Sequence, residues 1–145
     1  MAAFNFLRAA LLASTLLIAA AFAAVSATGA AETTAQSAAA TTLYSGQFEG
    51  AGGKRSGGTF EIFEADGKTF IRLSDDFHLS RVPDPKLAFG NGDYLDGTIY
   101  AKLTSFNGAQ VYEIPARLDP ATFTQVWIWC ERFGVPLAKA DIDAA

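Results

Sequence analysis

The fold is decided by two stretches near the C-terminus, Gly108-Ala-Gln-Val-Tyr-Glu-Ile-Pro115 and Thr122-Phe-Thr-Gln-Val-Trp-Ile-Trp-Cys130. Each is short, rich in β-branched and aromatic residues, and bounded by residues that favour turns, a pattern typical of β-strands. Side chains alternate between the two faces of a strand. The second stretch therefore has an aliphatic face that ends at Cys130 and an opposite face that carries two tryptophans.

Cys130 is the only cysteine of the chain. If the aliphatic face points into the core, the thiol is a small buried hydrophobe near the end of a strand, where a loop still gives access to it. A redox thiol needs a nearby cation, metal or helix N-terminus, and the neighbours Glu131 and Arg132 carry opposite charges. Without a second cysteine no internal disulfide forms, so mixed disulfides, sulfenate chemistry and intermolecular pairing stay open.

The strand pattern extends upstream of these two stretches. Four dipeptides that favour tight turns separate the runs of aromatic and β-branched residues: Asp66-Gly67, Asn91-Gly92, Asp96-Gly97 and Asn107-Gly108. The predicted strands cover residues 59–63, 69–73, 86–89, 98–103, 109–114 and 123–130. No segment shows a sustained helical stripe, and each short strand must bury one face against another sheet. We therefore predict an all-β fold, a small antiparallel β-sandwich or barrel-like single domain.

The N-terminus predicts export. One positive charge at Arg8 precedes an apolar run from Ala9 to Val25, and small residues then fit a cleavage site after Ala27. The run has about 17 residues, at the short limit for a membrane-spanning helix, so we expect residues 1–27 to be a cleaved signal peptide rather than an anchor. Residues 28–42 are predicted to be an Ala/Thr-rich flexible linker before a single domain at 43–145. We expect the mature protein to be secreted or periplasmic.

Charge and composition exclude several classes of partner. Removal of the signal peptide leaves 10 of the 11 basic residues against 15 acidic ones, a formal charge of −5. No basic cluster extends beyond Lys54-Arg55, so we expect no nucleic acid partner. No cysteine follows the hydrophobic run to accept a lipid, and no other segment is long and apolar enough to span a bilayer. We therefore expect no membrane association after cleavage of the signal.

Metal and haem sites have few candidate ligands. The mature chain has one cysteine, Cys130, one histidine, His78, and no methionine. A blue-copper site needs two histidines and a cysteine, and a structural zinc site needs four nitrogen or sulfur ligands. We therefore predict no metal and no bound cofactor, while a non-covalent haem with Cys130 or His78 as its axial ligand stays open. For His78, which lies beside a turn, we favour a solvated surface position.

The C-terminal residues also form a family pattern. A glycine–x–glutamine–x–tyrosine–x–isoleucine–proline strand precedes a strand that ends in isoleucine–tryptophan–cysteine, here Gly108, Gln110, Tyr112, Ile114 and Pro115, then Ile128, Trp129 and Cys130. In this pattern the chain resembles the DM13 domain, a small extracellular module found in bacteria and fused to DOMON-type domains in animals. The resemblance runs from Leu43 to the C-terminus. Val82 departs from it, because the family has a glycine there.

The resemblance implies an all-β domain in which the cysteine, here Cys130, serves electron transfer as a naked thiol or as a ligand to a prosthetic group. We therefore expect an exported domain with a role in extracytoplasmic redox or electron transfer through Cys130, with a redox or cell-envelope protein as its partner. The alternative is a non-enzymatic interaction module in which Cys130 is a buried packing residue. An edge strand or a surface formed by Trp127, Trp129, Tyr112 and Tyr100 then binds the partner. Whether the protein is an enzyme is left open.

Overall fold

The computed structural model describes residues 40–145, and this part of the chain is all-β. The predicted signal peptide and residues 28–39 of the predicted linker lie outside the described residues. The elements are β1 (Thr41–Gln47), β2 (Glu49–Gly50), β3 (Ser56–Gly57), β4 (Thr59–Ala65), β5 (Lys68–Leu73), β6 (His78–Leu79), β7 (Pro85–Asn91), β8 (Asp93–Tyr94), β9 (Ala101–Lys102), β10 (Gln110–Ile114), the 3-10 helix η1 (Pro120–Thr122), β11 (Gln125–Cys130), β12 (Val135–Asp141) and β13 (Asp143–Ala144). None of the described residues belongs to a helix that is long and apolar enough to cross a membrane.

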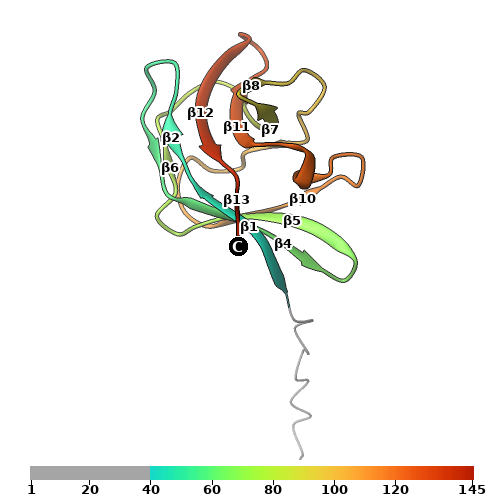
Figure 1. Ribbon diagram of the computed structural model, residues 1–145. Helices are drawn as coiled ribbons and strands as arrows, with labels where there is room; N and C mark the ends of the chain where they lie inside the picture. The colour runs from blue at the N-terminus through green and yellow to red at the C-terminus, as the bar shows by residue number, and fades with distance from the viewer. Residues whose placement is uncertain (1–39) are drawn as a thin grey trace, which may run out of the picture. The chain divides into compact units, whose positions relative to one another are not determined.

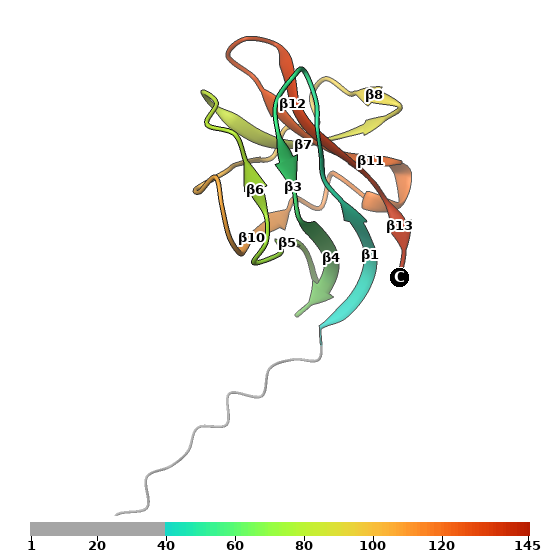
Figure 2. The same ribbon diagram turned by 90° about the vertical axis from the view of Figure 1, so that its left-hand side faces the viewer.

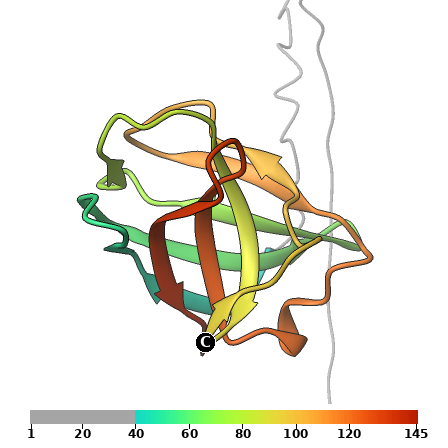
Figure 3. The same cartoon turned by 90° about the horizontal axis from the view of Figure 1, so that it is seen from above.

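The strands form two main antiparallel sheets, so the predicted fold class is confirmed. The five-stranded sheet has the order β10-β5-β4-β1-β13, and the six-stranded sheet has the order β2-β12-β11-β7-β8 with β9 beside β7. A small third sheet pairs β3 with β6. In Figure 1 the six-stranded sheet lies above the five-stranded one. Seen from above in Figure 3, β7, β11 and β12 cross steeply over the strands of the other sheet.

Two strands bend out of one sheet and into the other, which makes the sandwich barrel-like. β1 pairs with β13 in the five-stranded sheet, while their sequence neighbours β2 and β12 pair in the six-stranded sheet. Figure 2 shows β12 leading into β13 at this corner. Strands that switch sheets form the corners of orthogonally packed sandwiches. Gly46 lies at the corner, where a Cβ would be 2.1 Å from the carbonyl oxygen of Asp141 and 2.5 Å from a ring carbon of Phe60.

The hydrophobic core lies between the two sheets. Its largest fully buried side chains are Phe60, Phe77, Phe89, Ile62, Ile71, Leu73, Leu87, Ile128, Leu137, Val126 and Cys130. The aliphatic face of β11 points into this core, as alternation along the sequence predicts. Truncation of a fully buried side chain such as Ile128 to alanine costs roughly 2–5 kcal/mol in cores of this kind.

Most of the predicted strands are present, but the one predicted at residues 98–103 shortens to β9, Ala101–Lys102. The side chain of Thr98 explains the difference. Its Oγ1 accepts a hydrogen bond from the N–H of Phe89 at 3.0 Å and lies 2.8 Å and 2.6 Å from the carbonyl oxygens of Phe89 and Leu95. A side chain therefore satisfies the backbone of β7 at the place where a longer β9 would have paired.

The sequence patterns missed β1 and β12. β1 begins at Thr41, so its first two residues fall inside the predicted linker. β12 contains Pro136, which cannot donate to a ladder and is tolerated in strands at bulges. Such an irregularity is present: Ile128 faces Ala138 and Trp129 faces Pro136, so Leu137 has no partner of its own. The bulge places both Leu137 and Ala138 in the core.

Candidate functional site

Cys130 is the last residue of β11 and lies wholly inside the core. Its side chain is 0 % exposed and shares the inner face of the strand with Val126 and Ile128. Its neighbours across the sheet are Pro85 on β7 and Val135 on β12. Cys130 is a free thiol. The burial anticipated for the aliphatic face therefore holds for the thiol as well.

The chain leaves the core directly after Cys130. The backbone carbonyl of Cys130 accepts hydrogen bonds from the N–H groups of Phe133 and Gly134, at 3.3 and 2.8 Å, and these close the β11–β12 hairpin. Phe133 is 60 % exposed. The thiol is thus one residue away from an exposed hairpin but has no exposed surface itself. A reagent that must touch the sulfur needs a local opening of the fold first.

The outer face of β11 carries Trp127 and Trp129, and Trp129 forms an aromatic pair with Tyr94. Trp129 is half-buried and stacks on Tyr94 of β8, with ring centroids 4.1 Å apart and ring planes 5° apart. Trp127 lies edge-on to Trp129, with centroids 6.4 Å apart, and is only 7 % exposed. Gly90 makes room for Trp127, because a Cβ on Gly90 would lie 2.4 Å from the indole Nε1. The partly exposed ring on this face is therefore that of Trp129.

The four aromatic residues of the predicted stacking surface do not form one surface. Trp127 is buried. Tyr100 stacks on the core residue Phe89 at 5.2 Å, and its hydroxyl is buried without a hydrogen-bond partner in residues 40–145. Burial, together with the nearby Tyr112, raises the pKa of Tyr100. Tyr100 thus belongs to the inner side of the fold and Trp129 to the outer side, so this part of the prediction was wrong.

Tyr94, the residue that does stack on Trp129, carries too weak a sequence signal to be predicted. The signal was a single aromatic residue between two turn dipeptides, Asn91-Gly92 and Asp96-Gly97. Such a residue cannot be assigned to a strand from periodicity, because β8 is only two residues long. Its contact with Trp129 depends on the pairing of β7 with both β8 and β11.

Four charged side chains lie at the end of β11 that carries Cys130. Lys86 Nζ contacts the carboxylate of Glu131 and lies 3.5 Å from that of Asp84, while Lys102 Nζ lies 3.4 Å from Asp84. The hydrogen bond to Glu131 is the main cause that raises the pKa of Lys86. Desolvation opposes ionisation of Asp84, but hydrogen bonds and charges of the two lysines hold its pKa below 3.8. The two positive and two negative charges balance, so the network offers Cys130 no excess of positive charge.

The surroundings of Cys130 do not fit a prosthetic group. Because the side chain has no exposed surface, a haem or metal held through its sulfur would need the packed core to move apart. His78 is exposed on β6, as predicted, and lines a separate hollow with the polar residues Arg55, Ser80 and Asn107. Pockets for large cofactors are predominantly apolar. Within residues 40–145, no three His, Cys, Asp or Glu side chains lie close enough together to hold a metal ion.

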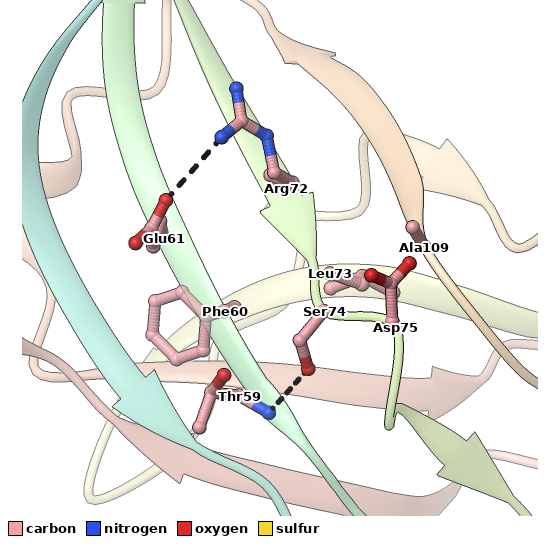
Figure 4. Close-up of a pocket in the computed structure, with 8 residues that line it drawn as sticks. All are labelled: Thr59, Phe60, Glu61, Arg72, Leu73, Ser74, Asp75 and Ala109. Atoms are coloured by element: carbon pink, nitrogen blue, oxygen red, sulfur yellow. Dashed lines mark hydrogen bonds and ion pairs between the residues drawn. The ribbon is translucent and has the colours of Figure 1, made fainter.

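One hollow lies on the side of β4 and β5, away from Cys130. It has a volume of about 220 Å³, and Figure 4 shows its lining side chains. Three of its side chains already have partners in the protein: Arg72 and Glu61 form an ion pair at 3.6 Å, and Ser74 Oγ accepts a hydrogen bond from the N–H of Thr59 at 2.8 Å. Asp75 lines the hollow without a hydrogen bond or ion pair to the described residues. This hollow therefore offers few free groups to a ligand.

A larger hollow of about 470 Å³ lies beside the aromatic pair. It is lined by Tyr94, Asp96, Gly97, Ile99, Trp129, Glu131 and Gly134. Trp129 and Glu131 are the two chain neighbours of Cys130, so the hollow opens on the surface nearest to the thiol along the chain. Chemically, this region combines a buried sulfur, a partly exposed aromatic pair and an acidic rim.

A comparison with known protein families finds a match that covers most of the described residues. A family model described as "Electron transfer DM13" matches residues 47–142, which include Cys130 and all strands from β2 to β12. No curated protein and no solved structure matches the chain. Because the family match spans well over half of the chain, this protein belongs to the DM13 family, whose model is described as an electron-transfer domain.

Proposed function

We propose that this DM13 domain transfers electrons outside the cytoplasm and that Cys130 is the group that is oxidised and reduced. The observation that carries the proposal is the position of Cys130. It is the only cysteine, it lies within the segment matched by the electron-transfer family, and its neighbour Trp129 reaches the surface. Export rests on the signal-peptide pattern of residues 1–27.

The burial of Cys130 is compatible with one-electron transfer but unfavourable for thiol–disulfide exchange. Thiol–disulfide exchange requires a thiolate to attack in direct contact, and Cys130 has no exposed surface. One-electron transfer requires proximity rather than contact. In this step the thiol loses one electron and one proton and becomes a thiyl radical. The electron passes to a one-electron acceptor on a partner protein, and the proton passes to water at the β11–β12 hairpin through a local fluctuation that admits water but not a bulkier reagent.

A redox titration of the purified mature domain with soluble one-electron mediators tests the proposal. The wild type is expected to exchange one electron per molecule reversibly, and Cys130→Ala is expected to exchange none. Cys130→Ala removes one buried sulfur atom, at a cost of about 1 kcal/mol, so circular dichroism should show a folded variant. Cys130→Ser, which nearly keeps the volume, serves as a second variant. Reversible exchange that persists in both variants would exclude Cys130 as the redox group.

The second candidate function is a non-enzymatic interaction module of the cell envelope. Two observations favour it: Cys130 packs in the core like an aliphatic residue, and Trp129 is partly exposed on the strand that leads into the hairpin of Phe133, which is 60 % exposed. Exposed aromatic residues of this kind often anchor protein interfaces. In this case Cys130 contributes only to stability.

Binding of the purified domain to isolated cell-envelope fractions separates the two functions. The interaction module requires that Trp129→Ala loses binding while Cys130→Ala keeps it. Val111→Ala is the control for Trp129→Ala, because Val111 is 53 % exposed but lies on β10 of the other sheet. If Trp129→Ala and Val111→Ala bind as well as the wild type, the aromatic face is not the binding surface.

A further inference from the structure

The hollow beside Trp129 has a lining that suits a particular class of ligand. Its volume of about 470 Å³ lies in the range typical of small-molecule pockets, roughly 300–1,000 Å³. Glycines at positions 97 and 134 leave its rim low, since neither carries a side chain. Ile99 and the Trp129 ring form an apolar wall, and Asp96 and Glu131 supply carboxylates. No basic side chain lines it.

The two carboxylates differ in how far they are neutralised. Glu131 is engaged by Lys86, whereas Asp96 forms no ion pair with any of the described residues. Asp96 Oδ1 accepts hydrogen bonds from the N–H of Gly97 at 3.1 Å and from the hydroxyl of Tyr94 at 3.4 Å. One unit of negative charge therefore faces the hollow without a counter-ion in this part of the chain.

The pKa of Tyr94 is consistent with this negative charge. Its pKa is raised by partial burial first, then by the charge and hydrogen bond of Asp96 and by the charge of Glu131. The Asp96 carboxylate lies 3.4 Å from the phenol hydroxyl, and the charge of Glu131 acts on the same group. The faces of aromatic rings are also negative, so Trp129 adds to the attraction for a cation.

We propose that this hollow binds a primary alkylammonium group, with its N–H donors on Asp96, Glu131 and the Tyr94 hydroxyl and its alkyl stem against Ile99 and Trp129. A primary ammonium has three N–H donors, one for each of the three acceptors among the residues that line the hollow. A quaternary ammonium has none. The same chemistry is offered by a free aliphatic amine and by a lysine side chain of a partner protein.

Fluorescence titration tests the site, because Trp129 is one of only two tryptophans in the chain. The probe is n-butylammonium at low ionic strength, where screening of the carboxylates is weakest. Saturable binding is expected, and Asp96→Asn should weaken it about fivefold, the change for loss of one unit charge at roughly 4 Å in water. Asparagine keeps the turn and the hydrogen bonds of Asp96. Glu131→Gln tests the second carboxylate independently.

Asp66→Asn is the matched control. It removes the same charge at the β4–β5 turn, where asparagine tolerates the positive φ of 52°. Wild-type affinity in this variant supports a local site. Absence of saturable binding, equal affinity in Asp96→Asn and wild type, or equal affinity for tetramethylammonium would each overturn the proposal.

A peptide with one lysine in a neutral sequence identifies the source of the amine. Tighter binding of the peptide than of n-butylammonium assigns the site to a lysine of a protein partner, whereas equal or weaker binding assigns it to a free amine. The inference does not depend on electron transfer at Cys130. Amine binding can fail while the redox titration still detects one electron, and the reverse holds equally.

Discussion

Gly90→Ala places a methyl group where β7 has no space for one. The new Cβ would lie 2.2 Å from the carbonyl oxygen of Asp93 and 2.4 Å from Nε1 of Trp127, so the β7–β8 turn and a buried indole must both move. Overpacking of this kind costs about 1–3 kcal/mol. Alanine recovers roughly 0.5–1 kcal/mol relative to glycine in a strand. The net loss, about 1 kcal/mol at the middle of both ranges, corresponds to a fall in Tm of roughly 4–8 °C for a domain of this size.

Thermal unfolding followed by circular dichroism measures this loss, and tryptophan fluorescence reports the displacement of Trp127. Gly57→Ala is the control, because the atoms nearest to its Cβ all belong to the ring of His78, the first at 2.5 Å, and that exposed ring can turn away. The control should change stability by less than about 0.5 kcal/mol. Equal Tm values for Gly90→Ala and Gly57→Ala would refute the packing described for the outer face.

Three further predictions concern buried polar groups and the charge network. Thr98→Val leaves the backbone N–H of Phe89 without its partner, so urea unfolding should show a loss of about 1–3 kcal/mol; an unchanged midpoint would speak against the role of Oγ1. Tyr100→Phe removes a buried hydroxyl that has no partner in residues 40–145, so the Tm should stay constant or rise, and a clear fall would show that the hydroxyl is satisfied. The pKa of Asp84 lies below 3.8 and that of Lys86 above 10.5, so their stabilising contribution is lost as the pH falls below 3.8 or rises above 10.5. In Asp84→Asn the free energy of unfolding should fall less steeply as the pH drops below 3.8. A fall as steep as in the wild type would contradict this role of Asp84.

Much of the fold could be predicted because its signals are local. The turn dipeptides work through their own backbone, as at Asp66-Gly67, where both residues have positive φ, 52° and 71°. The face assignment of β11 needs only the alternation of side chains. β12 could not be recognised in the same way, because Pro136 and the bulge at Leu137 interrupt its pattern. Its strand character comes from its neighbours β2 and β11 rather than from its residues.

The candidate site could be predicted in part for a similar reason. The position of Cys130 on the inner face follows from the strand pattern, and the exposure of His78 follows from its turn. The stacking of Tyr94 on Trp129 could not be foreseen, because it joins two strands through a third, β7. The hollow beside them brings together residues from the β8–β9 connection and the β11–β12 hairpin, which are distant in sequence.

Electron exchange through a buried thiol is tested most directly by comparing two rates on the same native protein. One is the rate of oxidation by a soluble one-electron oxidant, taken as the part that Cys130→Ala abolishes. The other is the rate at which a maleimide labels Cys130 without denaturant. We predict that oxidation is much faster than labelling, because labelling needs an opening that admits the whole maleimide, whereas oxidation needs only the passage of a proton to water. Equal rates would show that Cys130 reacts only after opening and would contradict electron transfer through the intact fold.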